Sequence, residues 1–108
     1  MVFASVNEIF ETIPKFFNAD AARGMDAVFQ FDISGEDGGA WHLTVREGTY
    51  EIKKGRHDNP AVTLTMSAET WLGILNKDLN AMKAFMFGKL KVSGDMMLAQ
   101  RIPQLFSL

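Results

Sequence analysis

The chain has 108 residues, 47% of them hydrophobic, and carries a net charge of −2. This length suits one domain over residues 1–108, and the lack of a basic excess argues against a nucleic-acid partner. The chain has no cysteine, which excludes disulfides, thiolate catalysis and Cys-based metal sites. With no secretory signal pattern and no apolar run long enough to cross a bilayer, it is predicted to be a soluble protein of the cytoplasm.

The first 24 residues predict a broken helix. Ser5 and Glu8 have the spacing of a capping box, which satisfies the first free amides of a helix. Apolar residues then recur every three or four positions, at Val6, Ile9, Phe10, Ile13, Phe16 and Phe17. Pro14 removes an amide donor and clashes with the preceding turn, so the helix should kink or restart there. A short helical turn over residues 18–24 is expected to end at Gly24.

A change to a period of two predicts strands from Met25 onward. Apolar residues alternate with polar ones in four consecutive runs, which cover residues 25–33, 41–46, 50–52 and 62–66. Glycine-containing turns at 35–39 and 47–48 and a loop at 56–60 separate the runs. Such short connections predict an antiparallel meander.

Two helices, a short strand and a final helix are predicted to follow. Ser67 and Asp78 are candidate N-caps for the two helices, Leu90 and Val92 lie on one face of a fifth strand, and Asp95 caps the last helix. The element order predicts an α+β fold with a five-stranded, mainly antiparallel sheet and about five helices covering one face.

Few residues suggest catalysis or metal binding. The candidate bases are His42, which the alternation places on the solvent face of its strand, and His57, which lies in a charged loop. No His and carboxylate spacing predicts a metal site. The segment from Gly88 to Asp95 lacks the Lys-Ser/Thr pair of a phosphate-binding loop. We therefore predict no catalytic residue, no metal and no cofactor.

Methionine and phenylalanine are concentrated in the second half of the chain. The cluster contains Met66, Met82, Phe85, Met86, Phe87, Met96, Met97 and Phe106. Methionine is unbranched and polarizable, so it adapts to varied apolar partners. Four amphipathic helices and a one-sided sheet supply more apolar side chains than a compact two-layer core needs, which favours a hydrophobic cavity between the layers.

Four consecutive segments of the chain are similar to one known family. Phe87-Gly-Lys-Leu-Lys-Val-Ser-Gly-Asp95, followed by a Met/Leu-rich helix, resembles the C-terminal signature of the sterol carrier protein type 2 (sterol-binding) domain family. Three upstream segments resemble that family in the same order, namely residues 28–33, 40–46 and 61–67. The resemblance covers roughly Ser5 to Phe106.

The resemblance implies a hydrophobic tunnel for fatty acids, acyl-CoA, sterol-like or isoprenoid lipids, which the domain binds and transfers without chemistry of its own. The chain lacks the fused thiolase or dehydrogenase of some members, and residues 106–108 differ from the Ser-Lys-Leu peroxisomal address. These departures imply a stand-alone cytoplasmic carrier, which we expect to be a monomer or a weak dimer. Lys83, Lys89 and Lys91 could favour transient contact with anionic membranes, although three charges on a solvent face are the commoner interpretation.

Strand alternation, helical spacing and the resemblance together predict the residues that line the cavity. They are Phe29, Phe31, Leu43 and Val45 on the sheet and Ile74, Met82, Phe85, Met86, Met97, Ile102 and Leu105 on the helices. Arg23 is a candidate contact for a lipid carboxylate at the mouth, although a solvated surface arginine is the commoner role for such a residue. The last helix, which Pro103 interrupts, is the predicted gate.

Two other classes of function remain open. The Met/Phe-rich surface could bind a partner protein or a second copy of the chain. Alternatively, Asp32 or Tyr50 could supply acid–base chemistry in an apolar pocket, as in steroid isomerases.

Overall fold

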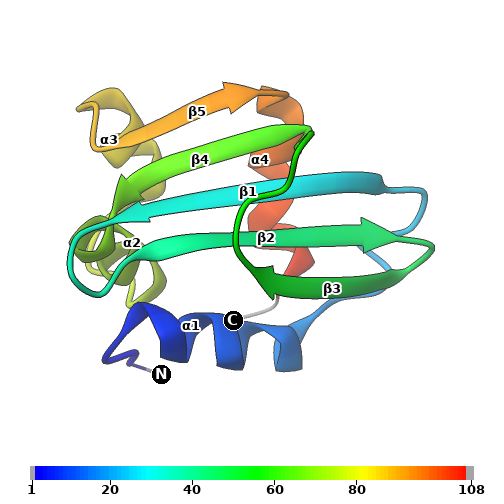
Figure 1. Cartoon of the computed structure of the whole chain (residues 1–108), viewed down its shortest axis with the longest axis horizontal. Coiled ribbons are helices and arrows are strands. Elements are labelled where there is room, and N and C mark those ends of the chain that lie inside the picture. Colours follow the sequence, from blue (N-terminus) through cyan, green and yellow to red (C-terminus); the bar gives the residue numbers. More distant parts are fainter. Residues whose placement is uncertain (1, 107–108) are drawn as a thin grey trace.

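The computed structural model describes residues 2–106 (Figure 1). Ser107 and Leu108, which belong to the segment compared with a peroxisomal address, lie outside this range. Nine elements flank or form one sheet, with a short 3-10 helix after the first. In chain order they are α1 (Val6–Thr12), the 3-10 helix η1 (Ile13–Phe16), β1 (Asp26–Ser34), β2 (Gly39–Arg46), β3 (Thr49–Lys54), β4 (Val62–Ser67), α2 (Ala68–Leu75), α3 (Ala81–Met86), β5 (Leu90–Gly94) and α4 (Met96–Leu105). The α+β class and the five-stranded sheet are confirmed.

The sheet has the strand order β3-β2-β1-β4-β5, and one pair in it is parallel. β1, β2 and β3 form the predicted antiparallel hairpins, and β5 pairs antiparallel with β4. β4, however, pairs parallel with β1, so the predicted meander is wrong at this point. Alternation in Val62, Leu64 and Met66 determines which face of β4 is apolar, but it does not determine the partner strand. The chain crosses from the β3 edge to the free side of β1 (Figure 1).

The crossing segment covers part of the sheet face that lies away from the helices. Gln30 is only 2% exposed there, and its Oε1 accepts a hydrogen bond of 2.9 Å from the His57 backbone N–H. Arg56 forms an ion pair of 3.3 Å with Asp32, which also accepts a hydrogen bond of 3.1 Å from Gln30 Nε2. His42 Nδ1 lies 3.0 Å from the Gly55 carbonyl oxygen. His42 and His57 are therefore half-buried rather than solvated, because they help to hold the crossing segment.

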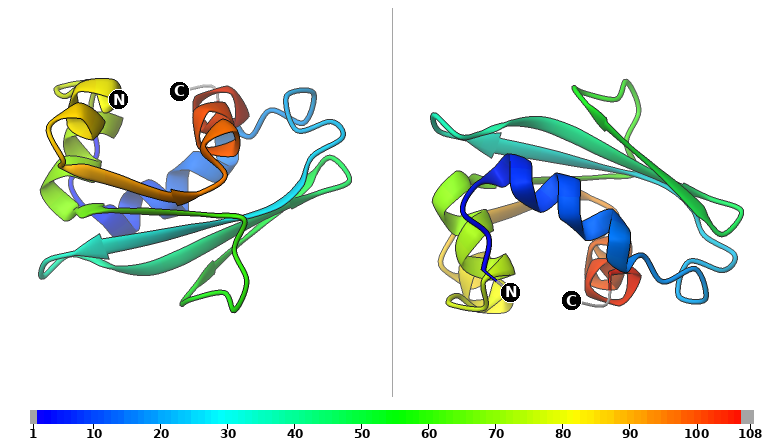
Figure 2. Two further views of the ribbon diagram at one scale, coloured as in Figure 1. Left: turned by 90° about the horizontal axis from the view of Figure 1, so that it is seen from above. Right: turned by 90° about the horizontal axis from the view of Figure 1, so that it is seen from below.

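All the helices lie on the other face of the sheet (Figure 2). Ser5 Oγ accepts the Glu8 amide at 3.1 Å, as its capping role predicts, and Pro14 stands in η1, where the regular helix has ended. Ser67 and Asp95 are the N-caps of α2 and α4, as predicted. Asn80 caps α3 in place of Asp78. The described residues contain four α-helices and η1, so the helix count differs slightly from the prediction of about five, and residues 18–24 form turns rather than a helix.

An aromatic cluster joins the helix layer to the sheet. Phe10 of α1 stacks on Trp41 of β2 with a centroid distance of 4.7 Å and lies 5.8 Å from Trp71 of α2. Phe31 of β1 meets Phe10 edge-on at 5.5 Å. The end of α4 returns to the start of the chain, where Phe106 forms an isolated antiparallel bridge with Phe17. α1, α2, α4 and the sheet are thus packed around one core.

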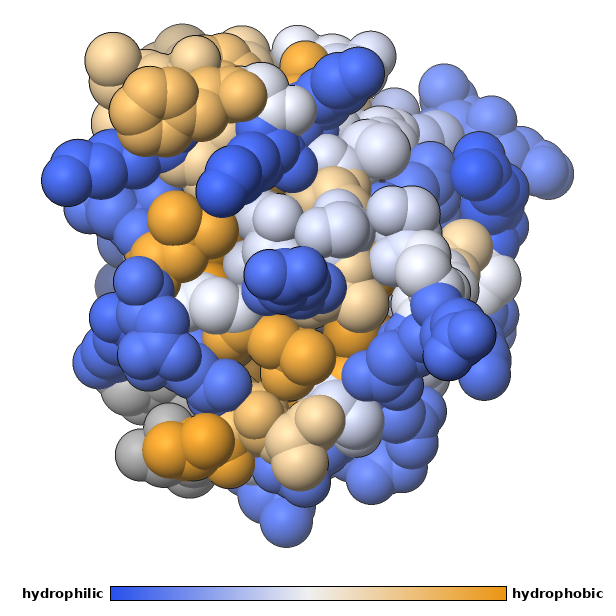
Figure 3. Space-filling view, turned by 90° about the vertical axis from the view of Figure 1, so that its left-hand side faces the viewer, coloured by the Kyte–Doolittle hydropathy of each residue, from blue (hydrophilic) through white to orange (hydrophobic). Residues whose placement is uncertain are grey.

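Large apolar side chains remain exposed at both ends of β5. Before the strand they are Met82, Phe85, Met86 and Phe87, and after it they are Met96 and Met97. On the face of the molecule in Figure 3, pale orange side chains gather at the top, where α3 lies, with blue hydrophilic side chains beside them. α3 has only six residues and buries only Ala84, so its longer side chains have no core to enter.

Candidate binding site

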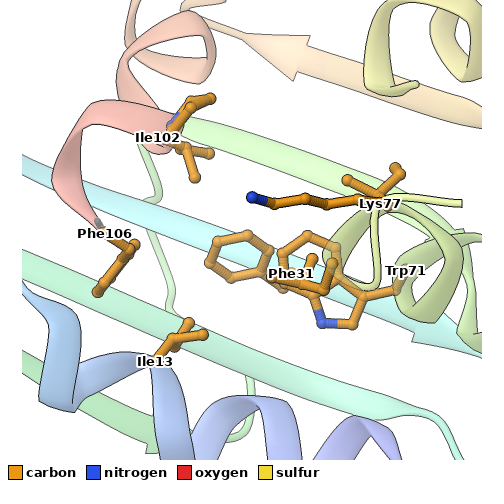
Figure 4. Close-up of a pocket in the computed structure, with 9 residues that line it drawn as sticks. Ile13, Phe31, Trp71, Lys77, Ile102 and Phe106 are labelled. Atoms are coloured by element: carbon orange, nitrogen blue, oxygen red, sulfur yellow. The ribbon is translucent and has the colours of Figure 1, made fainter. Parts of the chain in front are cut away.

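A cavity of about 230 Å³ opens on the helix side of the sheet, between the end of α2 and the end of α4 (Figure 4). β1 contributes its floor and η1 one side. The lining residues are Ile13, Phe31, Trp71, Ile74, Leu75, Lys77, Ile102, Pro103 and Phe106. All but Lys77 are apolar or aromatic in character, so the cavity suits a hydrocarbon ligand better than a polar one.

Two aromatic side chains form the inner part of the cavity. The Phe31 and Trp71 rings lie 5.5 Å apart between centroids and are tilted by 36°, and both side chains are almost completely buried. Trp71 Nε1 is buried without a hydrogen-bond partner among the described residues. A buried unsatisfied donor costs about 1–3 kcal/mol. The inner wall therefore holds one unused polar atom in an otherwise apolar setting.

Lys77 is the only charged residue among those that line the cavity. In the view of Figure 4 its side chain extends from the end of α2 toward Ile102, with the ammonium between the Ile102 and Phe31 side chains. The Lys77 backbone has a φ of +65°, a left-handed conformation that is uncommon for a residue with a side chain. Asn76, just before it, bonds the backbone of Phe3 through both side-chain atoms, at 2.6 and 3.0 Å. The end of α2 is thus tied down, which directs Lys77 toward the opening.

The predicted lining residues fall into three groups in the structure. Phe31, Ile74 and Ile102 line the cavity. Phe29, Leu43 and Val45 on the helix-covered face of the sheet and Leu105 of α4 are enclosed in the core, with at most 1% exposure. The residues that lie on the surface are Met82, Phe85, Met86 and Met97.

Six of the residues that line the cavity are absent from the predicted set, namely Ile13, Trp71, Leu75, Lys77, Pro103 and Phe106. Arg23 is exposed and pairs with Asp20 at 3.3 Å, and it does not line the cavity. Lys77 lies in the loop between α2 and α3, where no periodic pattern marks it. Trp71 and Phe106 lie in predicted helices, but the sequence does not indicate which helical residues reach the cavity. Periodicity identifies inward-facing positions, but it does not separate a core position from a cavity wall.

The arrangement offers little for acid–base or metal chemistry. Asp32 faces the far side of the sheet with Arg56, and Tyr50 packs on Phe17 at 4.8 Å, so neither lines the cavity. Within residues 2–106 there is no group of three or more His, Cys or acidic side chains that could hold a metal ion. No helix in that range is long and apolar enough to span a membrane.

The fold and the site define a small α+β domain with an apolar cavity between its helix layer and its sheet. A model of the SCP-2 sterol transfer family matches residues 6–107. The chain belongs to the SCP-2 sterol transfer family, as the four sequence segments predicted.

Known proteins are similar to this chain over different shares of their own length. Hydroxysteroid dehydrogenase-like protein 2 of Rattus norvegicus is 32% identical over 106 residues, which cover 97% of this chain and 20% of that protein. The structure of palmitated SCP2L2 from Aedes aegypti is 28% identical, with a TM-score of 0.78 and 96% of each chain covered. A stereoselective inverting sec-alkylsulfatase from Pseudomonas sp. is 22% identical, with a TM-score of 0.78 over 93% of this chain and 16% of that chain. The last likeness concerns the fold alone.

Proposed function

We propose that residues 1–108 act as one lipid-binding and lipid-transfer domain that performs no chemistry itself. The observation that carries the proposal is the apolar cavity between α2 and α4, with a single ammonium at its opening. Membership of the SCP-2 sterol transfer family and the likeness to a palmitated relative support it. The absence of cysteine fits a cytoplasmic setting.

The proposed ligand lies with its apolar chain on Phe31, Trp71, Ile74 and Ile102. A cavity of about 230 Å³ is smaller than the roughly 300–1,000 Å³ of typical ligand pockets, so a long acyl chain requires it to widen. α4 is the proposed moving wall. It ends at Leu105 with Pro103 inside it, and Arg101 attaches it to the turn before β1 through a 3.1 Å bond to the Ala21 carbonyl oxygen.

The proposed headgroup contact is Lys77 in place of Arg23. An ammonium at the opening of an apolar cavity favours an amphiphile with an anionic head, such as a fatty acid or a fatty acyl-CoA, over a neutral sterol. Burial of a long acyl chain contributes roughly 10 kcal/mol at about 0.8 kcal/mol per methylene. Association costs of about 4–15 kcal/mol leave a micromolar, reversible complex, which suits a carrier that must release its ligand.

The direct test fills the cavity. Ile102→Trp places an indole between α4 and Lys77, and we expect it to abolish palmitate uptake measured by native mass spectrometry and by calorimetric titration. Gln104→Trp is the matched control, because Gln104 is exposed on the same helix and does not line the cavity. A thermal melt of each variant shows that it is folded. Palmitate uptake that is equal in both folded variants would place the ligand elsewhere.

A further inference from the structure

We infer that the protein docks on anionic lipid bilayers through α3 and the start of β5. The docking surface, called the α3 tip below, consists of Met82, Lys83, Phe85, Met86, Phe87 and Lys89. Docking on a bilayer and lipid uptake are separate properties, although both would serve the same carrier.

The apolar face of α3 points to solvent instead of toward the core. Met82, Phe85 and Met86 stand at positions i, i+3 and i+4, so they share one face of α3, and this face points to solvent. Met82 is 60% exposed, Met86 73% and Phe87 75%. Only Ala84 points inward and is buried. A soluble helix normally turns such a stripe to the core, so an outward stripe indicates an external apolar partner.

Lysines outnumber acidic residues in the segment that carries this apolar face, although Glu69 and Asp78 share a pocket lining with Lys89. Residues 77–94 contain four lysines and one aspartate, whereas the whole chain has a net charge of −2. Lys83 lies within α3, and Lys89 and Lys91 follow it, all three exposed. Lysines on an edge strand would by themselves be explained by protection of the open edge of the sheet. Protection of the sheet edge does not explain the exposed Met and Phe side chains beside these lysines.

The combination of charge and apolar surface selects one occupant. A second copy of the chain, meeting this surface with its own α3 tip, would bring the lysines of both copies together, which is repulsive. An anionic bilayer complements both features, because lysine ammonium groups reach phosphate and carboxylate headgroups while flexible Met and Phe side chains enter the upper acyl region. The position of the tip also suits a carrier, because the α2–α3 connection, residues 76–80, contains Lys77, which lines the cavity (Figure 4).

The experiment is sedimentation of the full chain with vesicles of phosphatidylcholine, with and without phosphatidylserine. We expect binding to the phosphatidylserine vesicles and its loss at about 1 M salt, where the screening length falls to about 3 Å. Met86→Ser should weaken binding, and Met97→Ser should not. Met97 is the matched control because it is equally exposed, at 77%, but lies beyond the other end of β5.

A second pair of variants tests the charge. Each lysine near an anionic surface strengthens binding roughly fivefold, so Lys83→Glu should reduce it at least fivefold. Lys53→Glu is the control, since Lys53 lies on β3 at the opposite edge of the sheet. Equal losses in Lys83→Glu and Lys53→Glu, or in Met86→Ser and Met97→Ser, would overturn the assignment of the α3 tip.

Other outcomes separate this inference from the proposed function. A chain that takes up palmitate but ignores both kinds of vesicle overturns docking and leaves lipid binding intact. A chain that binds vesicles but takes up no lipid overturns the proposed lipid binding and leaves docking intact. A third outcome is a dimer that sediments without vesicle binding and that Met86→Ser disrupts. This outcome would identify the α3 tip as a dimer interface and overturn docking on a bilayer.

Discussion

Around the cavity, apolar side chains of β1, α2 and α4 turn toward one another, whereas on the α3 tip the same kinds of side chain turn to solvent. The difference lies in the length and position of the helices. α2 and α4 have eight and ten residues and lie over the sheet, so each has a face to bury. α3 has six residues at the outer end of β5 and buries one alanine. Composition is similar in the two regions, and the packing encloses the apolar side chains of one region and exposes those of the other.

The largest expected contrast is in stability. Phe31→Ala removes a ring that is 2% exposed and contacts Phe10 and Trp71, so the free energy of unfolding should fall by about 3–5 kcal/mol. Phe87→Ala removes a ring from the α3 tip, and the change should stay within about 0.5 kcal/mol. Urea unfolding of both variants measures the difference. Similar losses would mean that Phe87 packs in solution against part of the protein.

The next contrast concerns the two candidate cations. Lys77→Gln should weaken palmitate binding about three- to tenfold, because a partly solvated ion pair contributes at most about 1 kcal/mol and a charged hydrogen bond somewhat more. Hexadecanol, which has no charge, should bind both forms alike. Arg23→Gln is the control, since Arg23 pairs with Asp20 away from the cavity. Calorimetric titration would contradict the headgroup assignment if Arg23→Gln lost more palmitate affinity than Lys77→Gln.

Sequence patterns predicted which face of each strand is buried. They did not predict which helical residues fill the core, line the cavity or lie on the surface. Phe29, Phe31, Leu43 and Val45 share the helix-covered face, because alternation on a strand is a property of the local backbone. The parallel pairing of β4 with β1 depends on a crossing segment that carries no periodic signal of its own. Whether an inward residue fills the core or lines a cavity depends on how far α2 and α4 stand apart. No local pattern encodes that separation, so Phe31 and Phe29 could not be distinguished.

A smaller effect tests one error of helix assignment. Asn80 Oδ1 accepts the amides of Met82 and Lys83 at 2.8 and 3.2 Å, so Asn80→Ala should cost about 1 kcal/mol of stability or fray α3. Asp78, the N-cap expected from sequence, makes no described cap bond, and Asp78→Ala should be close to neutral. Both residues are exposed, which makes them a matched pair. Chemical denaturation that ranked them in the opposite order would restore Asp78 as the cap.

The smallest expected effect is the most informative about the cavity wall. Trp71→Phe removes an indole that is 6% exposed, and a change of this size in a solid core usually destabilises. Here it also removes the unpartnered N–H, whose burial costs about 1–3 kcal/mol, and the vacated space joins a cavity that already exists. The two effects should nearly cancel, leaving the free energy of unfolding within about 1 kcal/mol of the original. Denaturant titration that showed a loss of about 3 kcal/mol or more, typical of a ring removed from a packed core, would mean that this wall is closed in solution and that the N–H has a partner.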